Sequence, residues 1–134
     1  MALLVQFLAG MWVNLFVSIP AAHPGSRPPE HFAGSATSVA WAITSSGLPA
    51  LVFHATWGLV LGFGSLALAA SARRLRRHGI TVAAVAGFLC VLGTGFNGGS
   101  FPDFDENFSS MLMASLFALA ALADLVILNA LAGD

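Results

Sequence analysis

His54 is the only ionisable residue in the apolar stretch from residue 48 to residue 70. Ionisable side chains at membrane depth are rare, and they more often serve a function than not. Three kinds of chemistry suit an imidazole there. It can hydrogen-bond to a neighbouring helix as a packing element, it can ligate a haem iron or a metal ion, or it can relay protons or contact a small ligand. The sequence leaves these alternatives open.

Three further residues are candidates for a ligand site around His54. Asn14 lies in the first apolar segment at a depth similar to that of His54, about 9 Å from the same end, since a helix rises about 1.5 Å per residue. Trp57 follows His54 by one helical turn and would make a pocket aromatic. Asn97 begins the outer loop that follows the third apolar segment, near or above the same level. We therefore predict a binding site built from Asn14, His54, Trp57 and Asn97.

A metal or haem site would need more ligands than His54. His23 and His31 lie in the segment between the first two apolar runs, and folding of that segment over the bundle would bring both towards His54. Haem is one candidate cofactor, and copper is another because Met111 and Met113 offer thioether sulfur. No HxxxH or CxxC spacing supports such a site, so the sequence does not decide whether a cofactor is bound.

Asp124 is the only acidic residue well within an apolar segment. We expect it to form a second, cytoplasmic polar layer with Gln6 and Arg73, through hydrogen bonds or an inward-reaching arginine. The alternative function for Asp124 is that of a proton carrier in a small proton-coupled transporter.

The composition indicates whether helices or strands position these residues. The chain is 57% hydrophobic and 8% charged, whereas soluble domains are typically about 25% charged. The apolar runs are continuous and approach the roughly 20 residues that a membrane-spanning helix needs. Barrel strands would alternate apolar and polar residues. The sequence therefore predicts an all-α integral membrane protein.

The predicted architecture is a four-helix antiparallel transmembrane bundle that forms a single domain. Each helix carries a stripe of small or polar residues that would face the interior. The predicted helices cover residues 2–20, 48–72, 80–96 and 108–131. We interpret residues 2–20 as a retained helix rather than a signal peptide, because no basic residues precede it. A short outer-surface helix is expected at residues 36–43.

The arginines predict the orientation. Four of the five lie in the loop at residues 73–79, and positively charged loops stay in the cytoplasm. Both termini are then cytoplasmic, and residues 21–47 and 97–107 form outer loops. The absence of lysine indicates GC-rich coding, which we interpret as bacterial, so the expected location is the plasma (inner) membrane.

No enzyme motif accompanies these features, since a nucleophile elbow, a P-loop, a metalloprotease helix and a redox cysteine pair are all missing. The leading prediction is a non-enzymatic accessory subunit or small-ligand binder that acts at its outer mouth. The expected partners are the lipid bilayer and another membrane protein or a second copy. A formal net charge of -1 gives no indication of nucleic-acid binding.

Overall fold

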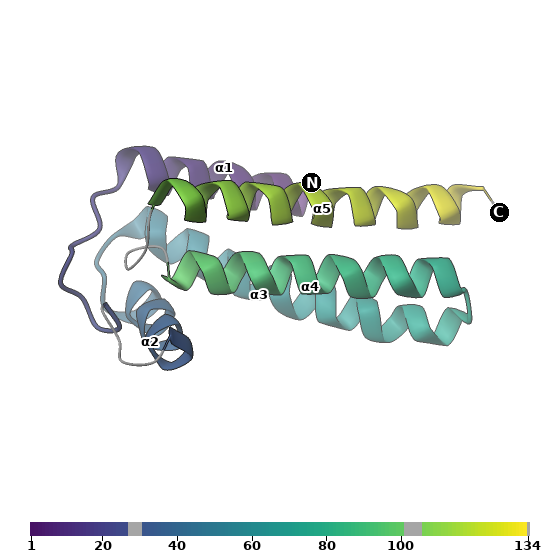
Figure 1. Ribbon diagram of the computed structural model, residues 1–134, viewed down its shortest axis with the longest axis horizontal. Coiled ribbons are helices and arrows are strands. Elements are labelled where there is room, and N and C mark those ends of the chain that lie inside the picture. Colours follow the sequence, from purple (N-terminus) through teal and green to yellow (C-terminus); the bar gives the residue numbers. More distant parts are fainter. Residues whose placement is uncertain (27–30, 101–105, 134) are drawn as a thin grey trace.

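The computed structural model describes residues 1–26, 31–100 and 106–133, and this part of the chain consists of helices joined by non-helical connections (Figure 1). The prediction of an all-helical protein is confirmed. The helices, with one short 3-10 turn called η1, are α1 (Ala2–Phe16), α2 (His31–Thr44), α3 (Pro49–Ala72), η1 (Arg73–Leu75), α4 (His78–Ser100) and α5 (Glu106–Ala132).

Three of these helices are long and apolar enough to cross a membrane. The candidate spans are Pro49–Leu75, His78–Gly99 and Phe108–Ala132. Their outward faces carry large apolar side chains, such as Phe63 with 72% of its surface exposed and Leu128 with 61%. Water-soluble monomers rarely expose contiguous apolar areas of that kind, so the fold supports the predicted membrane location.

The first helix is shorter than predicted. It ends at Phe16 instead of residue 20, because Val17 is extended, with φ -109 and ψ 116. Pro20 disfavours helical geometry at Ile19, and the β-branched side chains of Val17 and Ile19 add to that preference. Its 15 residues give a length of about 22 Å, less than the roughly 30 Å of a bilayer core.

As a result, α1 accompanies only half of the bundle. Figure 1 shows the N-terminus beside the middle of α5, whereas the C-terminus lies at the far end. We call the end where α2 packs the α2 end, and the opposite end, formed by residues 73–78, the arginine end.

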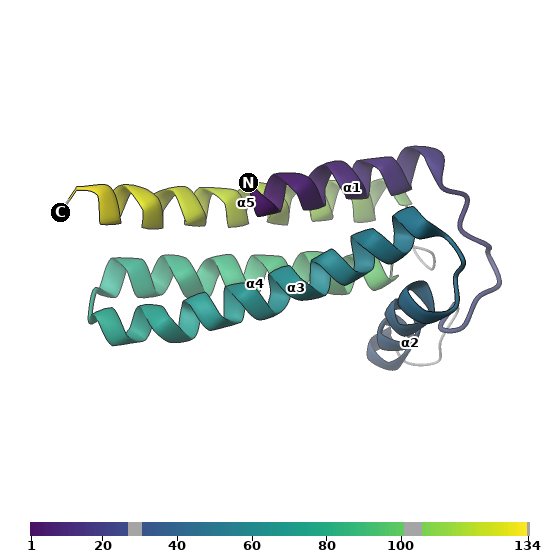
Figure 2. The same ribbon diagram turned by 180° about the vertical axis from the view of Figure 1, so that it is seen from behind.

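The second helix is longer than the expected helix at residues 36–43, and it packs against α3 and α4 (Figures 1 and 2). Ala42 joins Val13 of α1 and Leu51 of α3 in a small buried cluster. Its buried side chains therefore make α2 an integral part of the packed structure at the α2 end.

Helix α4 continues through the glycine-rich run that was expected to end it at residue 96. Glycine lowers helix propensity by about 1 kcal/mol, but here it permits close packing. A Cβ added at Gly99 would lie 3.2 Å from the carbonyl oxygen of Ser35 and 3.3 Å from a methyl group of Val39. The contact with α2 therefore depends on Gly99, and it favours the longer helix.

Side-chain hydrogen bonds hold α5 near both of its ends. At the α2 end, Asn97 Nδ2 donates to the carbonyl oxygen of Ser109 at 2.8 Å. At the arginine end, Arg77 Nη1 donates to the carbonyl oxygen of Ala130 at 3.3 Å. In between, the hydroxyls of Thr94 and Ser115 donate to carbonyl oxygens four residues earlier in their own helices.

The arginine end has a core of small residues. Arg76 takes a left-handed conformation, with φ 54, in the tight turn between α3 and α4. Thr81 Oγ1 lies 3.2 Å from the carbonyl oxygen of Ala72 and ties the two helices together. The buried residues behind this turn are Ala69, Ala72, Ile80, Ala84 and Ile127. Small side chains of this kind let helix backbones approach closely.

The orientation can be tested with single cysteines in a Cys90→Ser background. Ser45, next to α2, and Leu75, in the arginine turn, are both exposed. Because positively charged loops stay in the cytoplasm, we expect a membrane-impermeant maleimide to label Ser45→Cys in intact cells. Leu75→Cys should react only after permeabilisation. The reverse pattern would overturn the predicted orientation.

Candidate functional site

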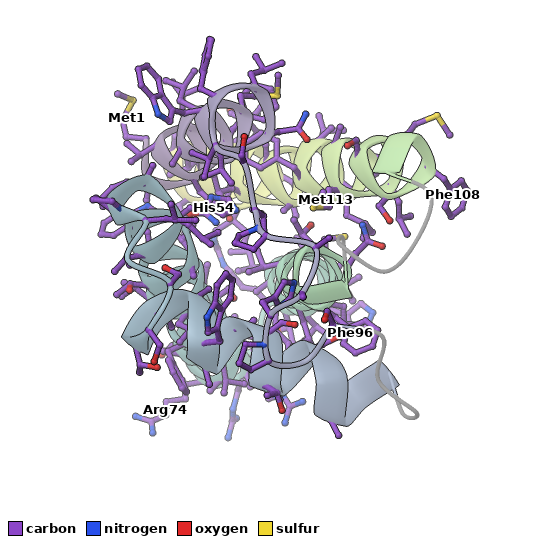
Figure 3. The ribbon with its side chains drawn as sticks, turned by 90° about the vertical axis from the view of Figure 1, so that its left-hand side faces the viewer. Met1, His54, Arg74, Phe96, Phe108 and Met113 are labelled. Carbon is purple, nitrogen blue, oxygen red and sulfur yellow. The ribbon has the colours of Figure 1, made fainter. Side chains whose placement is uncertain are left out.

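His54 lies where α1 and α3 pack against each other in an antiparallel pair (Figure 3). Its ring rests on Gly10, where an added Cβ would come within 2.8 Å of His54 Cε1. The side chain of Gln6 rests in the same way on Gly58, where an added Cβ would come within 3.1 Å of Gln6 Nε2. Each helix thus inserts one polar side chain into a glycine notch of the other.

A hydrogen bond reinforces this reciprocal packing. Gln6 Nε2 donates to the backbone carbonyl oxygen of His54 at 3.2 Å. The bond also determines the orientation of the Gln6 amide, because the flipped amide would place two acceptor oxygens against each other. This bond reaches the backbone of His54, whereas the imidazole packs on Gly10. The choice among the three chemistries that suit an imidazole there therefore stays a prediction.

The pair still leaves polar atoms without partners. His54 Nδ1 and Gln6 Oε1 are both buried and have no hydrogen-bond partner. A buried polar group left unpaired costs about 1–3 kcal/mol, so these two atoms favour a bound water or ligand beside them.

The other residues predicted to surround His54 lie elsewhere. Asn14 is exposed on α1, and Gln6 takes the place beside His54 that was expected for Asn14. Trp57 donates its indole N–H to the carbonyl oxygen of Ala2 at 3.2 Å, and its ring stacks on Phe53 with centroids 6.3 Å apart. Asn97 binds the backbone of α5. These contacts are made with other residues than His54, and a site formed by these three residues around the imidazole stays a prediction.

A sequence signal for the true neighbours was present. Gln6 precedes Gly10 by four residues, and His54 precedes Gly58 by four. Residues four apart share one helix face. In an antiparallel pair, each polar residue then faces the glycine of the other helix.

A second group of polar side chains gathers at the α2 end. His23 is only 8% exposed, and its ring stacks on Trp41 with centroids 4.6 Å apart. His23 Nδ1 lies 3.0 Å from the carbonyl oxygen of Pro24, an acceptor that selects the tautomer with the proton on Nδ1. His23 Nε2 is then a lone-pair acceptor, and it is buried without a partner.

The segment around His23 lies directly on α2. Gly25 has φ +91, and an added Cβ would come within 2.5 Å of the carbonyl oxygen of Gly34 and of Ser38 Oγ. Only glycine fits this position. The buried polar residues of the described part are His23, Ser35, Ser38 and Ser109. Every one of them belongs to the α2 end, so we call residues 17–26 together with α2 the cap.

The predicted metal ligands are not brought together among the described side chains. The His31 backbone begins α2, but its side chain lies outside the described part. His54 contacts Gly10 on α1, whereas His23 stacks on Trp41 and lies within hydrogen-bond distance of the carbonyl oxygen of Pro24. In the described residues, no three His, Cys, Asp or Glu side chains are grouped so that they could hold a metal ion.

The residues of the expected cytoplasmic polar layer lie at three different levels. Gln6 belongs to the His54 pair. Asp124 lies in the C-terminal half of α5, within electrostatic range of the α-amino group of Met1. Arg73 lies at the arginine end, where it lines an open hollow. The shortness of α1 explains why Gln6 lies at another level than predicted. In a short first helix, residue 6 lies beside the half of α3 that is nearer the α2 end.

No known family model matches the sequence, and comparisons with curated proteins and with solved structures likewise give no significant match.

The glycine notch at Gly10 can be tested by Gly10→Ala. The added methyl group would collide with the His54 ring, and overpacking of this kind costs roughly 1–3 kcal/mol. We expect a lower melting temperature in detergent. Gly62→Ala is the matched control, because nothing lies within 4 Å of a Cβ at Gly62. In a His54→Ala background the same change at Gly10 should cost much less. An equal cost in both backgrounds would contradict the reciprocal packing.

Proposed function

We propose that this protein is a non-enzymatic, multi-pass protein of the plasma membrane that binds a small polar ligand beneath its cap. In this arrangement α3, α4 and α5 cross the bilayer and the arginine end faces the cytoplasm. Helix α1 forms the fourth, shorter member of the bundle and points its N-terminus inward. The cap then lies on the outer side, where a ligand would arrive.

One observation carries the proposal. Within the described residues, the buried side-chain atoms without a partner are Gln6 Oε1, His23 Nε2 and His54 Nδ1. All of them lie in the cap or in the helix pair next to it. Native proteins leave few such atoms unsatisfied, and each one calls for an explanation such as a water or a ligand.

The chemistry of these atoms indicates what the ligand offers. Gln6 Oε1 is an acceptor, and His23 Nε2 is an acceptor in the tautomer that Pro24 selects. Small molecules that donate hydrogen bonds, such as alcohols and amines, suit each of these two atoms at its own place. Apolar walls around a few polar groups are typical of sites for small ligands.

Binding can be followed by NMR of ¹⁵N-histidine-labelled protein in lipid nanodiscs, with glycerol and ethanolamine as probes because both are small and donate hydrogen bonds. We expect a probe to shift the Nε2 signal of His23 and the Nδ1 signal of His54. His78, exposed at the arginine end, serves as the internal control and should keep its signal. Gln6→Leu should weaken the response of His54.

Two results would contradict the proposal. If neither probe moves the signals of His23 and His54, ordered water alone satisfies these atoms. If the His78 signal moves equally, the probes act through the bilayer. Metal analysis and a visible spectrum of the same sample test the haem or metal alternative, which predicts bound metal or colour that His54→Ala abolishes. That alternative and the proton-coupled transporter that uses Asp124 stay predictions.

A second candidate function is that of a subunit in a membrane assembly, and the half-length of α1 favours it. Beyond the end of α1, Gly62 of α3 has open space around it. On α5, Asp124 and Leu128 continue the face on which Phe117 stacks with Phe7 of α1. A helix of a second copy could continue along this uncovered face, and Gly62 would let it approach closely.

The assembly is tested by Gly62→Leu, with Gly64→Leu as the matched control because nothing lies within 4 Å of a Cβ at either glycine. We expect native mass spectrometry to show dimers of the wild type and of the Gly64 variant, and mainly monomers of the Gly62 variant. A wild type that is monomeric in mild detergent and in nanodiscs would exclude a second copy at this face.

A further inference from the structure

The turn between α3 and α4 carries a basic hollow that the proposed function does not use. Arg73, Arg76, His78 and Thr81 line it, and it is open to the surroundings. Thr81 Oγ1 lies within hydrogen-bond distance of the carbonyl oxygens of Ala72 and Arg77. The single hydroxyl proton of Thr81 is shared between these two acceptors, and its contact with Ala72 ties the end of α3 to the start of α4 beside the hollow.

The four arginines of this turn differ in what they contact. The guanidinium of Arg77 is engaged with the carbonyl oxygen of Ala130. Arg74 points away from the bundle (Figure 3) and is not among the residues that line the hollow. In the part of the chain that the structure describes, no carboxylate neutralises Arg73 or Arg76. Arg73 and Arg76 therefore both line one hollow, and their charge is uncompensated within the described residues.

Guanidinium groups match phosphate in geometry, because the planar fork donates two parallel hydrogen bonds to phosphate oxygens. The hollow thus has the charge and the donors for a phosphate group. Apolar side chains flank the turn, since Leu75 is 54% exposed and Val82 is 52% exposed. These flanks suit acyl chains, which a free phosphate ion does not have.

From this geometry we propose that the hollow of Arg73 and Arg76 binds the phosphate group of an anionic phospholipid, with an acyl chain along Leu75 and Val82. The turn follows directly on the spanning helices, so it lies at the depth of the headgroups. Basic residues next to membrane spans attract anionic lipid by about 1 kcal/mol each near the surface. The proposal adds a defined site to that general attraction.

The test compares single neutralisations that change the net charge equally. Wild type, Arg73→Gln, Arg76→Gln and Arg74→Gln are reconstituted in nanodiscs that contain phosphatidylglycerol and phosphatidylcholine, and retained lipid is measured by native mass spectrometry. We expect phosphatidylglycerol to be retained preferentially by the wild type. Arg73→Gln and Arg76→Gln should each reduce that retention by about fivefold, which corresponds to about 1 kcal/mol. Arg74→Gln should change it by less than about twofold.

Competition with inorganic phosphate distinguishes the two sources of a phosphate group. Millimolar phosphate should not displace the lipid, because the acyl chain contributes to binding. Displacement by phosphate alone would overturn the assignment to a lipid, and an equal loss in all three variants would reduce the site to a diffuse basic surface. If Arg76→Gln lowers the melting temperature through the left-handed turn, Arg73→Gln, at a right-handed helical position, decides the question.

Discussion

The close approach of α1 to α3 is the contact on which the α2 end of the molecule depends. It is made possible by two glycines, Gly10 and Gly58, that receive the side chains of His54 and Gln6. In a bilayer, helices gain little from burying apolar surface against each other, because lipid tails are equally apolar. Shape complementarity and hydrogen bonds must therefore supply the association. If α1 moved away, the imidazole and the amide would face hydrocarbon with unpaired polar atoms, which is costly.

The two ends of the bundle are stabilised by different means. At the arginine end, a core of alanines and isoleucines lets α3, α4 and α5 approach closely, and few polar atoms are buried there. At the α2 end, buried serines and His23 connect the cap to the bundle. Polar interiors have strict directional requirements. The α2 end is consequently the part of the molecule in which an additional polar molecule would make the larger difference.

The sequence predicted the element type because continuous apolar runs with few charges leave little choice in a membrane. The end of α1 was harder to predict, since it depends on the local preferences of Val17, Ile19 and Pro20, which interrupt an otherwise apolar run. The length of α4 was missed for the opposite reason. Its glycines argue against a helix locally, and only the contact of Gly99 with α2 outweighs that preference. Tertiary packing of this kind is invisible in a single sequence.

The candidate site likewise has features that the sequence predicts and features that only tertiary packing decides. His54 could be singled out from its residue type alone, and so could the expectation that it packs against a helix. The four-residue spacing of polar residue and glycine is a signal for its partner, but the choice between Asn14 and Gln6 also depends on how far α1 extends along α3. The sequence also could not predict that Nε2 of His23 is buried without a hydrogen-bond partner. This state follows from a bond between Nδ1 and the carbonyl oxygen of the next residue, Pro24.

Hydrogen bonds attach α5 to α4 and to the arginine turn near both ends of the helix. Asn97 fixes it to α4 at the α2 end, and Arg77 fixes it at the arginine end. Between these points, Thr94 and Ser115 donate hydrogen bonds within their own helices, so α5 is held against α4 there by van der Waals packing. A helix attached in this way resists displacement along its axis and bends most easily near its centre. Lateral pressure in the bilayer would therefore bend α5 near Leu119 and Ala120, midway between Ser109 and Ala130, before it shifted either end.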